Sequence, residues 1–486
     1  MRVLFVASEC APFAKAGGLG DVVGALPKSL WQLGHDARVL LPKYGMLDAE
    51  GFVRRPEPMG VPLGFGTAWC AVWEGRLPGS DVPIYLLEHD AAFGGATIYG
   101  GEGGTLSGGI KFGLLSRAAF ELSRYLGWVP HVFHTHDWPS AWLPVMANSV
   151  EAGGAFDRAA TILTIHNMAH QPTFPPETLA HLGMGYADFR ADGLEDHGEV
   201  NPFKGGLYHA TMITTVSPRY AQEIRSPFGG SGLEHVTELR GRDLVGILNG
   251  IDADVWDPRT DVHLPARYGP EDLSGKAACK AELERRAGFD PEPEGPLLGV
   301  VSRLTYQKGL DVLAAGLDRL VAAGARLVLL GSGETSIQSQ LLAVAARHPD
   351  RVAMRFVYNE PLAHLIEAGA DLFLMPSRFE PCGLNQLYSQ RYGTLPVVHA
   401  TGGLDDTVEQ CDPLTGQGTG FKMFSLSADA LVHTVCWAMD VYRHQPDLFR
   451  RLQHNGMSKE MGWEAIAPRY VDLYRWGLER KGVFDV

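Results

Sequence analysis

Two series of short apolar runs limit most strongly what this chain can fold into. The runs are Val3–Ala7, Ala37–Leu41, Ile84–Leu87, Val132–Thr135, Thr161–Ile165 and Met212–Val216, followed by Leu297–Val301, Arg326–Leu330, Val352–Phe356, Leu372–Met375 and Leu395–His399. Segments with apolar residues at helical spacing separate them. Continuous apolar strands suit parallel sheets that are buried on both faces, and strands that alternate with helices form doubly wound domains. The sequence therefore predicts an α/β fold with two Rossmann-like, doubly wound domains.

The boundary between the domains falls near Asn249–Pro258, where the first series has ended. A chain of 486 residues is too long for one hydrophobic core. We expect an N-terminal domain over residues 1–250, a C-terminal domain over residues 251–462, and a C-terminal helix within residues 463–486 that crosses back to the N-terminal domain. Two local features carry further expectations. Glycine is frequent in Phe93–Gly109, which indicates a mobile loop, and Pro27 is expected to kink or restart the first helix.

Charge and cysteine content exclude several classes of protein. The net charge is −14, which argues against a general nucleic-acid binder because such proteins carry a basic surplus. The six cysteines are scattered without a Cys-x-x-Cys pair, so neither a disulfide framework nor a zinc ribbon is indicated. No apolar stretch approaches the roughly 18–20 residues that cross a bilayer, and the first apolar run is too short for a signal peptide. We expect a cytoplasmic protein with no nucleic-acid or membrane partner.

A glycine-rich loop follows the first expected strand, at residues Lys15–Asp21 (Lys-Ala-Gly-Gly-Leu-Gly-Asp). Glycine lets the backbone approach a ligand closely, and the N–H groups at a helix start attract an anion. Lys15 adds a full positive charge. Ordinary βα turns also use glycine for their geometry alone, so this loop by itself leaves both interpretations open.

Three loops of the second series supply complementary chemistry. Arg303 and Lys308 follow its first strand and face the crevice where open α/β sheets bind ligands, where they could neutralise a departing diphosphate. The alternative is that they are two solvated basic residues. Glu380 lies in a loop after the strand Leu372–Met375, where a carboxylate often binds sugar or ribose hydroxyls. The alternative is that Glu380 caps a helix, because Ser377 and Glu380 have capping-box spacing. The segment Thr401–Leu404 offers further backbone N–H donors to a phosphate.

Metal-binding alternatives fit the sequence poorly. A cluster is formed by His131, His134, His136 and Asp137. However, the order of its residues lacks the intervening residue and the final histidine of a metallo-hydrolase motif. The segment Asp252-Ala253-Asp254 matches a metal-binding Asp-x-Asp pattern. Its position in an expected turn between domains argues against a metal site there. We therefore expect no metal ion.

Taken together and in this order, these segments resemble bacterial glycogen synthases and plant starch synthases nearly end to end. The resemblance rests on residues 15–27, His134–Trp138, Thr164–Asn167, Asn249–Asp252 with Trp256–Pro258, Ser302–Leu304 with Gln307–Gly309, Pro376–Gln386, Arg391–Thr394 and Thr401–Leu404.

That resemblance implies a GT-B glycosyltransferase, in which two Rossmann-like domains face each other across a cleft. It implies transfer of glucose from ADP-glucose to the non-reducing end of an α-1,4-glucan, such as glycogen or a malto-oligosaccharide, with retained configuration. It implies no cofactor and no metal, since ADP-glucose is a substrate. Alternatives are a related retaining transferase that uses UDP-glucose or a small acceptor, and a non-catalytic glucan-binding protein.

The resemblance also implies roles for individual residues. The donor-binding residues would be Lys15, Gly18, Asn249, Arg303, Lys308, Tyr358, Glu380, Cys382, Gly383, Leu384, Thr401, Gly402 and Gly403. The acceptor side would hold Glu9, Asp21, Asp137, Trp138 and Asn167. The catalytic group would comprise His166, Asp137, Arg303, Lys308 and Glu380. Two positions depart from the family pattern: Ala16 replaces a threonine, and His170 replaces a tyrosine. Tyr388 stands where other retaining transferases carry a second glutamate, as is expected for the starch and glycogen synthases.

Overall fold

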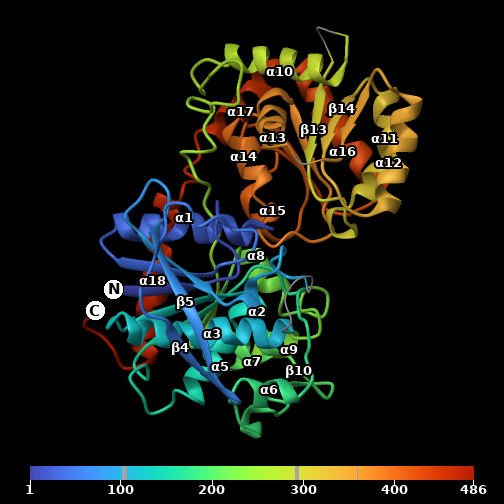
Figure 1. The fold of residues 1–486 in the computed structure, drawn as a ribbon. Helices are drawn as coiled ribbons and strands as arrows, with labels where there is room; N and C mark the ends of the chain where they lie inside the picture. Colours follow the sequence, from blue (N-terminus) through green and yellow to red (C-terminus); the bar gives the residue numbers. More distant parts are fainter. Residues whose placement is uncertain (101–106, 291–294, 358) are drawn as a thin grey trace. The chain divides into compact units, whose positions relative to one another are not determined.

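The computed structural model describes residues 1–100, 107–290, 295–357 and 359–486. The chain forms two compact units (Figure 1), residues 1–250 with 463–486 and residues 251–462. The expected site residue Tyr358 lies outside the described residues.

The first unit is built on a ten-stranded sheet with the order β12-β11-β8-β7-β1-β2-β6-β5-β3, and β4 pairs with β5. From β12 to β6 all neighbours are parallel, whereas β3, β4 and β6 run antiparallel to β5. Its strands are β1 (Arg2–Val6), β2 (Asp36–Pro42), β3 (Val53–Arg54), β4 (Met59–Leu63), β5 (Gly66–Arg76), β6 (Pro83–Glu88), β7 (Val132–His136), β8 (Ala160–Ile165), β11 (Met212–Thr215) and β12 (Leu244–Gly246), with a separate pair β9 (Glu195–Asp196) and β10 (Glu199–Val200). Its helices are α1 (Gly18–Gln32), α2 (Asp90–Phe93), α3 (Gly108–Tyr125), α4 (Asp137–Ser140), α5 (Trp142–Asn148), α6 (Glu177–His181), α7 (Pro202–His209), α8 (Pro218–Glu223), α9 (Glu234–Leu239) and α18 (Trp463–Arg480), with short 3₁₀ turns at Tyr186–Asp188 and Gly241–Asp243.

The second unit holds a six-stranded, all-parallel sheet with the order β15-β14-β13-β16-β17-β18. Its strands are β13 (Leu297–Val301), β14 (Arg326–Leu330), β15 (Val352–Arg355), β16 (Leu372–Met375), β17 (Leu395–His399) and β18 (Phe421–Met423). Its helices are α10 (Ser274–Ala287), α11 (Leu310–Ala322), α12 (Thr335–Arg347), α13 (Glu360–Gly369), α14 (Asn385–Arg391), α15 (Gly402–Thr407), α16 (Ala428–His444) and α17 (Pro446–Met457), with a 3₁₀ turn at Tyr306–Lys308.

Burial on both faces explains why the apolar runs are continuous. In β13, Leu298 and Val300 belong to one buried cluster, whereas Leu297 belongs to a second one. Because successive side chains of a strand point to opposite faces, both faces of this sheet are covered. Every run of the two series is a strand, which confirms the prediction of doubly wound α/β sheets.

Two expectations about local structure need correction, and one feature was not predicted. Helix α1 does not restart at Pro27 but continues through it from Gly18 to Gln32. The expected loop Phe93–Gly109 is shorter than predicted, because Phe93 ends α2 and Gly108 begins α3; residues 101–106 lie outside the described part. The antiparallel strands β3–β5 were not predicted at all.

The C-terminal helix α18 belongs to the first unit. In Figure 1 it is drawn in red among the blue and green elements of that unit. Tyr470, Leu473 and Tyr474 are fully buried on it. It packs on α1, β8 and β11.

The chain order of the strands gives each sheet a switch point, where connections leave in opposite directions. In the first unit this point lies between β1 and β7, and in the second between β13 and β16. Open α/β sheets bind ligands beyond the carboxyl ends of the strands at such a point. A ligand site is therefore expected in the loops that follow these strands.

Candidate active site

Glu9 holds the glycine-rich loop of the first unit in place. Its buried carboxylate accepts hydrogen bonds from the N–H groups of Ala16 at 2.7 Å and Gly17 at 2.9 Å, and from the hydroxyl of Tyr99. The resemblance had placed Glu9 beside the acceptor. In the structure its carboxylate shapes the loop, and two of the loop's N–H groups are already engaged.

The remaining anion-binding elements of this loop lie at the start of α1. Gly18 is the first residue of the helix, and among the described residues no acceptor pairs with its N–H group. Lys15 is half exposed, and its Nζ lies 2.7 Å from Oδ1 of Asp21. The loop thus offers an open helix start and an exposed, ion-paired lysine.

Asp137 occupies a strained and buried position directly after β7. Its φ of 53° lies in the left-handed region, which residues other than glycine rarely adopt. Its Oδ1 accepts hydrogen bonds from the N–H groups of His166 at 2.6 Å and Asn167 at 3.4 Å. Burial raises the pKa of Asp137 to about 7, against the lowering effect of these N–H groups. Strain of this kind is retained at functional sites when the surroundings enforce it.

The histidine cluster of the sequence does not gather around a common point. His131 directly precedes β7, and its ring accepts a hydrogen bond from the N–H of Arg2 at 3.0 Å. The ring of His134 forms a hydrogen bond with Tyr474, and the ring of His136 forms one with His166. Within the described part of the chain, no group of three or more histidine, cysteine or acidic side chains is arranged to hold a metal ion.

The other acceptor-side and donor-side residues of this unit are largely enclosed. Trp138 is 9% exposed and packs edge-on against Phe112, with ring centroids 4.9 Å apart. The side-chain oxygen of Asn167 accepts from the N–H of Ala169 at 3.0 Å. Asn249 is buried, and its Oδ1 has no hydrogen-bond partner in the described structure. The Oδ1 atom of Asn249 is therefore open to a donor group of a ligand.

In the second unit, Gly309 brings the loop after β13 against the loop after β16. Its φ is 65°, and a Cβ at this position would lie only 1.9 Å from the carbonyl oxygen of Pro376. Glycine is thus required for this close approach. The contact places Lys308 beside Glu380, with Nζ and Oε2 2.6 Å apart.

Glu380 and its neighbours form the centre of this half of the candidate site. Glu380 is 5% exposed and also accepts from the hydroxyl of Ser377 at 3.0 Å. The capping interpretation of Glu380 is wrong, because α14 begins only at Asn385. Arg303 is exposed, and among the described residues no carboxylate pairs with its guanidinium group.

Backbone contacts join the loop of Glu380 to the loop after β17. The N–H of Gly403 donates to the carbonyl of Glu380 at 3.0 Å. Gly402 has a φ of 45°, and a Cβ there would lie 2.0 Å from the same carbonyl. The amide of Gln386 donates to the carbonyls of Cys382 at 2.9 Å and Gly383 at 3.0 Å. The expected donor-side residues Glu380, Cys382, Gly383, Leu384, Thr401, Gly402 and Gly403 therefore form one connected surface at the carboxyl edge of the sheet.

Some residues of this region escaped the sequence reasoning. Tyr99 fixes Glu9, and Tyr474 reaches His134 from the far end of the chain. Neither has a local signal, because each partner lies distant in sequence. Arg378 is structural: it makes two 2.7 Å contacts with Asp311 and stacks on the ring of Tyr306.

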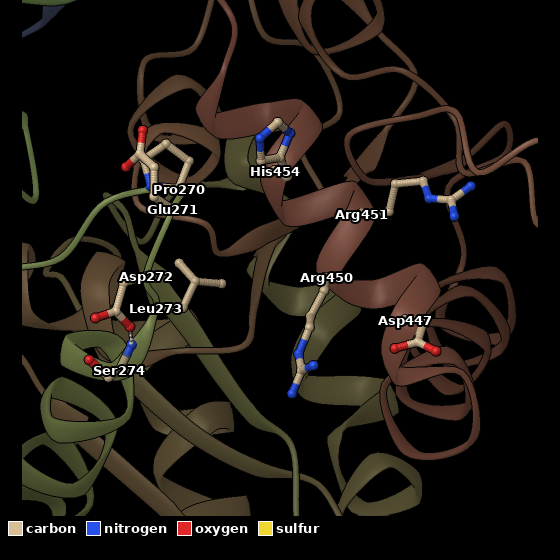
Figure 2. Close-up of a pocket in the computed structure, with 9 residues that line it drawn as sticks. All are labelled: Pro270, Glu271, Asp272, Leu273, Ser274, Asp447, Arg450, Arg451 and His454. Atoms are coloured by element: carbon tan, nitrogen blue, oxygen red, sulfur yellow. Dashed lines mark hydrogen bonds between the residues drawn. The ribbon is translucent and has the colours of Figure 1, made fainter.

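Two surface cavities of the second unit lie elsewhere. Figure 2 shows the first, of about 660 Å³, with residues 270–274 on one side and Asp447, Arg450, Arg451 and His454 of α17 on the other. The second, of about 1070 Å³, includes Gly295, Gly324, Arg351 and Asp371, which precede β13, β14, β15 and β16. These residues lie at the amino edge of the sheet, away from the loops described above.

Two doubly wound units that each gather cations, carboxylates and backbone N–H groups at a switch point are the architecture of GT-B glycosyltransferases. The family model for the starch synthase catalytic domain matches residues 2–238, and that for group 1 glycosyl transferases matches residues 283–449. Glycogen synthase 1 of Geobacter metallireducens is 47% identical over 99% of this chain and 97% of its own length. A glycogen synthase of Anaeromyxobacter dehalogenans is 46% identical, over 98% of this chain and 99% of its own.

Solved structures agree with this assignment. The catalytic domain of starch synthase IV from Arabidopsis thaliana, bound to ADP and acarbose, has a TM-score of 0.91 and 32% identity over 98% of this chain and 99% of its own. Sucrose-phosphate synthase from Thermosynechococcus elongatus, with a TM-score of 0.60 and 16% identity over 98% of both chains, shares the fold. The chain belongs to the family of bacterial glycogen synthases and starch synthases, and it is a hexosyltransferase. No helix among the described residues is long and apolar enough to cross a membrane.

Proposed function

We propose that this chain transfers glucose from ADP-glucose to the non-reducing end of an α-1,4-glucan, with retention of configuration and without a metal ion. One observation carries the proposal: Lys308, ion-paired to the buried Glu380, lies in the same loop as the unpaired Arg303 at the switch point of the second unit. Such a set provides positive charge for a diphosphate and a carboxylate for sugar hydroxyls. Relatives named glycogen synthase, and a similar enzyme bound to ADP and acarbose, support this choice of ligands.

Each group has a separate task in the proposed reaction. Arg303 and Lys308 neutralise the charge that develops on the departing diphosphate. Lys15 and the N–H of Gly18 offer a positive charge and a donor to the phosphates of ADP-glucose. Glu380 and the backbone of residues 382–384 hold the glucose hydroxyls, and Asn249 contributes its open oxygen to the donor. Catalysis then consists mainly of positioning and charge stabilisation.

Retention can arise in two ways. A double displacement requires a carboxylate nucleophile with a partner carboxyl group roughly 5 Å away. The candidate carboxylates are engaged differently: Glu380 with Lys308 and Ser377, and Asp137 with two backbone N–H groups. We therefore favour departure and attack on the same face of the sugar. The bond from the anomeric carbon to the phosphate oxygen breaks, the bond to the acceptor oxygen forms, and the acceptor proton passes to the leaving phosphate.

The six cysteines are free thiols, and five of them are buried. Free thiols persist in a reducing compartment, so we propose a cytoplasmic location.

An assay with glycogen and labelled ADP-glucose or UDP-glucose, in the presence of EDTA, tests the proposal. We expect label in ethanol-insoluble polymer, with ADP-glucose the better donor and no effect of EDTA. Label in a soluble glucoside would point to a small acceptor instead. Preference for UDP-glucose would contradict the proposal that ADP-glucose is the donor. Loss of activity in EDTA would contradict the proposal that no metal ion is needed.

A further inference from the structure

Three histidines at the carboxyl edge of the first unit are not explained by the proposed reaction. His134 lies within β7, His136 ends it, and His166 follows β8. The ring of His136 stacks on that of His134 with centroids 4.3 Å apart, and the ring of Phe5 lies 5.8 Å away in a nearly parallel plane. His134 is fixed in turn by Tyr474 of α18 at 2.8 Å and by Thr164 at 2.6 Å. The plane of the His136 ring is therefore set by its neighbours.

All three rings are neutral. Burial lowers the pKa of His134 and of His166 to about 3, and it lowers the pKa of His136 well below its usual value. A neutral imidazole carries one N–H donor and one acceptor nitrogen. The position of one proton in this group consequently determines the positions of others.

The two nitrogens of His136 differ sharply in their surroundings. Nδ1 lies 3.0 Å from Nε2 of His166, whereas Nε2 is buried and has no hydrogen-bond partner in the described structure. If the proton of His136 is on Nε2, a buried N–H group is left without an acceptor. If the proton is on Nδ1, only an acceptor is left without a donor. Buried N–H groups without a partner are the rarer case in folded proteins, so the second arrangement is favoured.

We infer that His136 donates its Nδ1 proton to Nε2 of His166 and thereby fixes His166 as the tautomer with its proton on Nδ1. His166 is half-buried, and its Nδ1 bonds to no other described residue. It therefore presents a hydrogen-bond donor to a hydroxyl oxygen of the bound sugar. His136 acts through His166 and is a positioning residue. The sugar contact rests on the proposed function, whereas the proton positions do not.

This tautomer also limits what His166 does in the reaction. Its Nδ1 has no lone pair available, and its Nε2 is occupied by His136. His166 therefore accepts no proton from the acceptor hydroxyl, which agrees with transfer of that proton to the departing phosphate. The proton position thus separates a binding role for His166 from a general-base role.

Nitrogen NMR of the protein labelled with ¹⁵N-histidine measures the tautomer directly. We expect Nδ1 of His166 to be protonated and Nε2 to be unprotonated in the ligand-free wild-type chain, with the signals identified by their loss in His166→Ala. In His136→Leu, which removes the donor, we expect protonation to shift toward Nε2 of His166. Protonation of Nε2 in the wild-type chain would overturn the inference. Because this experiment involves no reaction, it stands even if the wild-type chain makes no polymer.

A double-mutant cycle tests whether His136 acts through His166. We expect His136→Leu to lower kcat about tenfold, the worth of one hydrogen bond, and to lower it no further when His166 is already alanine. A full, additive loss in that background would mean that His136 supports the fold only. If His136→Leu does not fold, His136→Phe, which keeps an aromatic ring against His134 and Phe5 but removes the donor, takes its place in the same cycle.

His131→Leu serves as the matched control, because His131 directly precedes β7, at the end opposite to His136. It should leave kcat and the His166 signals unchanged. A change in the His166 signals in this control would mean that they report general disturbance of β7 rather than the His136 contact.

Discussion

At the scale of single residues, both lysines of the candidate site are held by a carboxylate of that site. Lys15 pairs with Asp21 and Lys308 with Glu380, each within 2.7 Å. The Lys15 side chain is 47% exposed and that of Lys308 only 18%, so solvent screens the second pair less. A bound diphosphate would meet Lys308 in the less screened setting. Replacement of Lys308 should therefore lower kcat more than replacement of Lys15.

Replacing Lys308 by alanine should lower kcat about 100- to 1000-fold, because the leaving diphosphate loses a charge partner in the transition state. The same change leaves the buried carboxylate of Glu380 without its cation, which adds to the loss. Initial rates of polymer formation from ADP-glucose measure the effect. Lys459→Ala is the matched control, since Lys459 is also ion-paired in the second unit, to Glu409 at 2.7 Å. Near-normal turnover of Lys308→Ala would contradict the role of Lys308 as a charge partner of the leaving diphosphate.

Asp137 gives a prediction about pH and stability. Its pKa is raised by burial from 3.8 to about 7. Between these values the folded chain holds a proton that the unfolded chain has released, so this group makes stability fall as pH rises from about 4 to about 7. Asp137→Asn keeps an acceptor for His166 and tolerates a positive φ, but it cannot ionise.

The stability of Asp137→Asn relative to wild type should therefore increase from pH 4 to pH 7 and stay constant above pH 7. Urea unfolding of both chains across this range measures the difference, and other titrating groups cancel because they are common to both. A difference that does not change with pH would show that Asp137 ionises normally in the folded chain.

Local sequence patterns reveal some features of the site and hide others. Lys15, Arg303, Lys308 and Glu380 were found because each follows a recognisable strand. The engagement of Glu9 with the N–H groups of Ala16 and Gly17 was not, since it depends on how the loop folds back. The same bond bears on Ala16, which stands where related proteins carry a threonine. Its N–H donates to Glu9 while its side chain is exposed, so the alanine leaves the hydrogen bonds of the loop intact.

At the scale of secondary-structure elements, burial decided what was predictable. Strands such as β8 are buried along their whole length and appear as continuous apolar runs. The long strand β5 has a mixed pattern with several exposed residues, so it left no such signal. Sheet order was also beyond the sequence, because it depends on pairings between distant segments. The switch points therefore became visible only in the structure.

The packing of α18 depends on a hydroxyl group that can be removed alone. Tyr474 is fully buried, and its hydroxyl lies 2.8 Å from Nδ1 of His134. Tyr474→Phe should lower the free energy of unfolding by about 1–2 kcal/mol, because a buried polar nitrogen loses its partner. Denaturant titration measures this loss. Tyr186→Phe should have no effect, since Tyr186 is 57% exposed; equal stability of the two variants would contradict a role of the hydroxyl in anchoring α18.

At the scale of the whole molecule, the chain passes between its two units twice, at residues 250–251 and 462–463. The two crossing segments lie together in each unit. The N–H of Ile251 donates to the carbonyl of Met461 at 2.9 Å, and a Cβ on Gly250 would lie 2.8 Å from the nitrogen of Trp463. Paired crossings of this kind concentrate any relative motion at a few backbone positions, as in a hinge.

If the two units act on one diphosphate, ADP should draw them together, because closure is what assembles such a site. Small-angle X-ray scattering should then show a smaller radius of gyration with ADP than without it. AMP, which lacks the second phosphate, should produce less contraction. Lys15→Ala should still bind ADP through the second unit, measured by calorimetry, yet contract less, because Lys15 is the cation that the first unit contributes. Identical scattering profiles with and without saturating ADP would show that closure does not accompany nucleotide binding, and the two sets of cations would then have to act in separate steps.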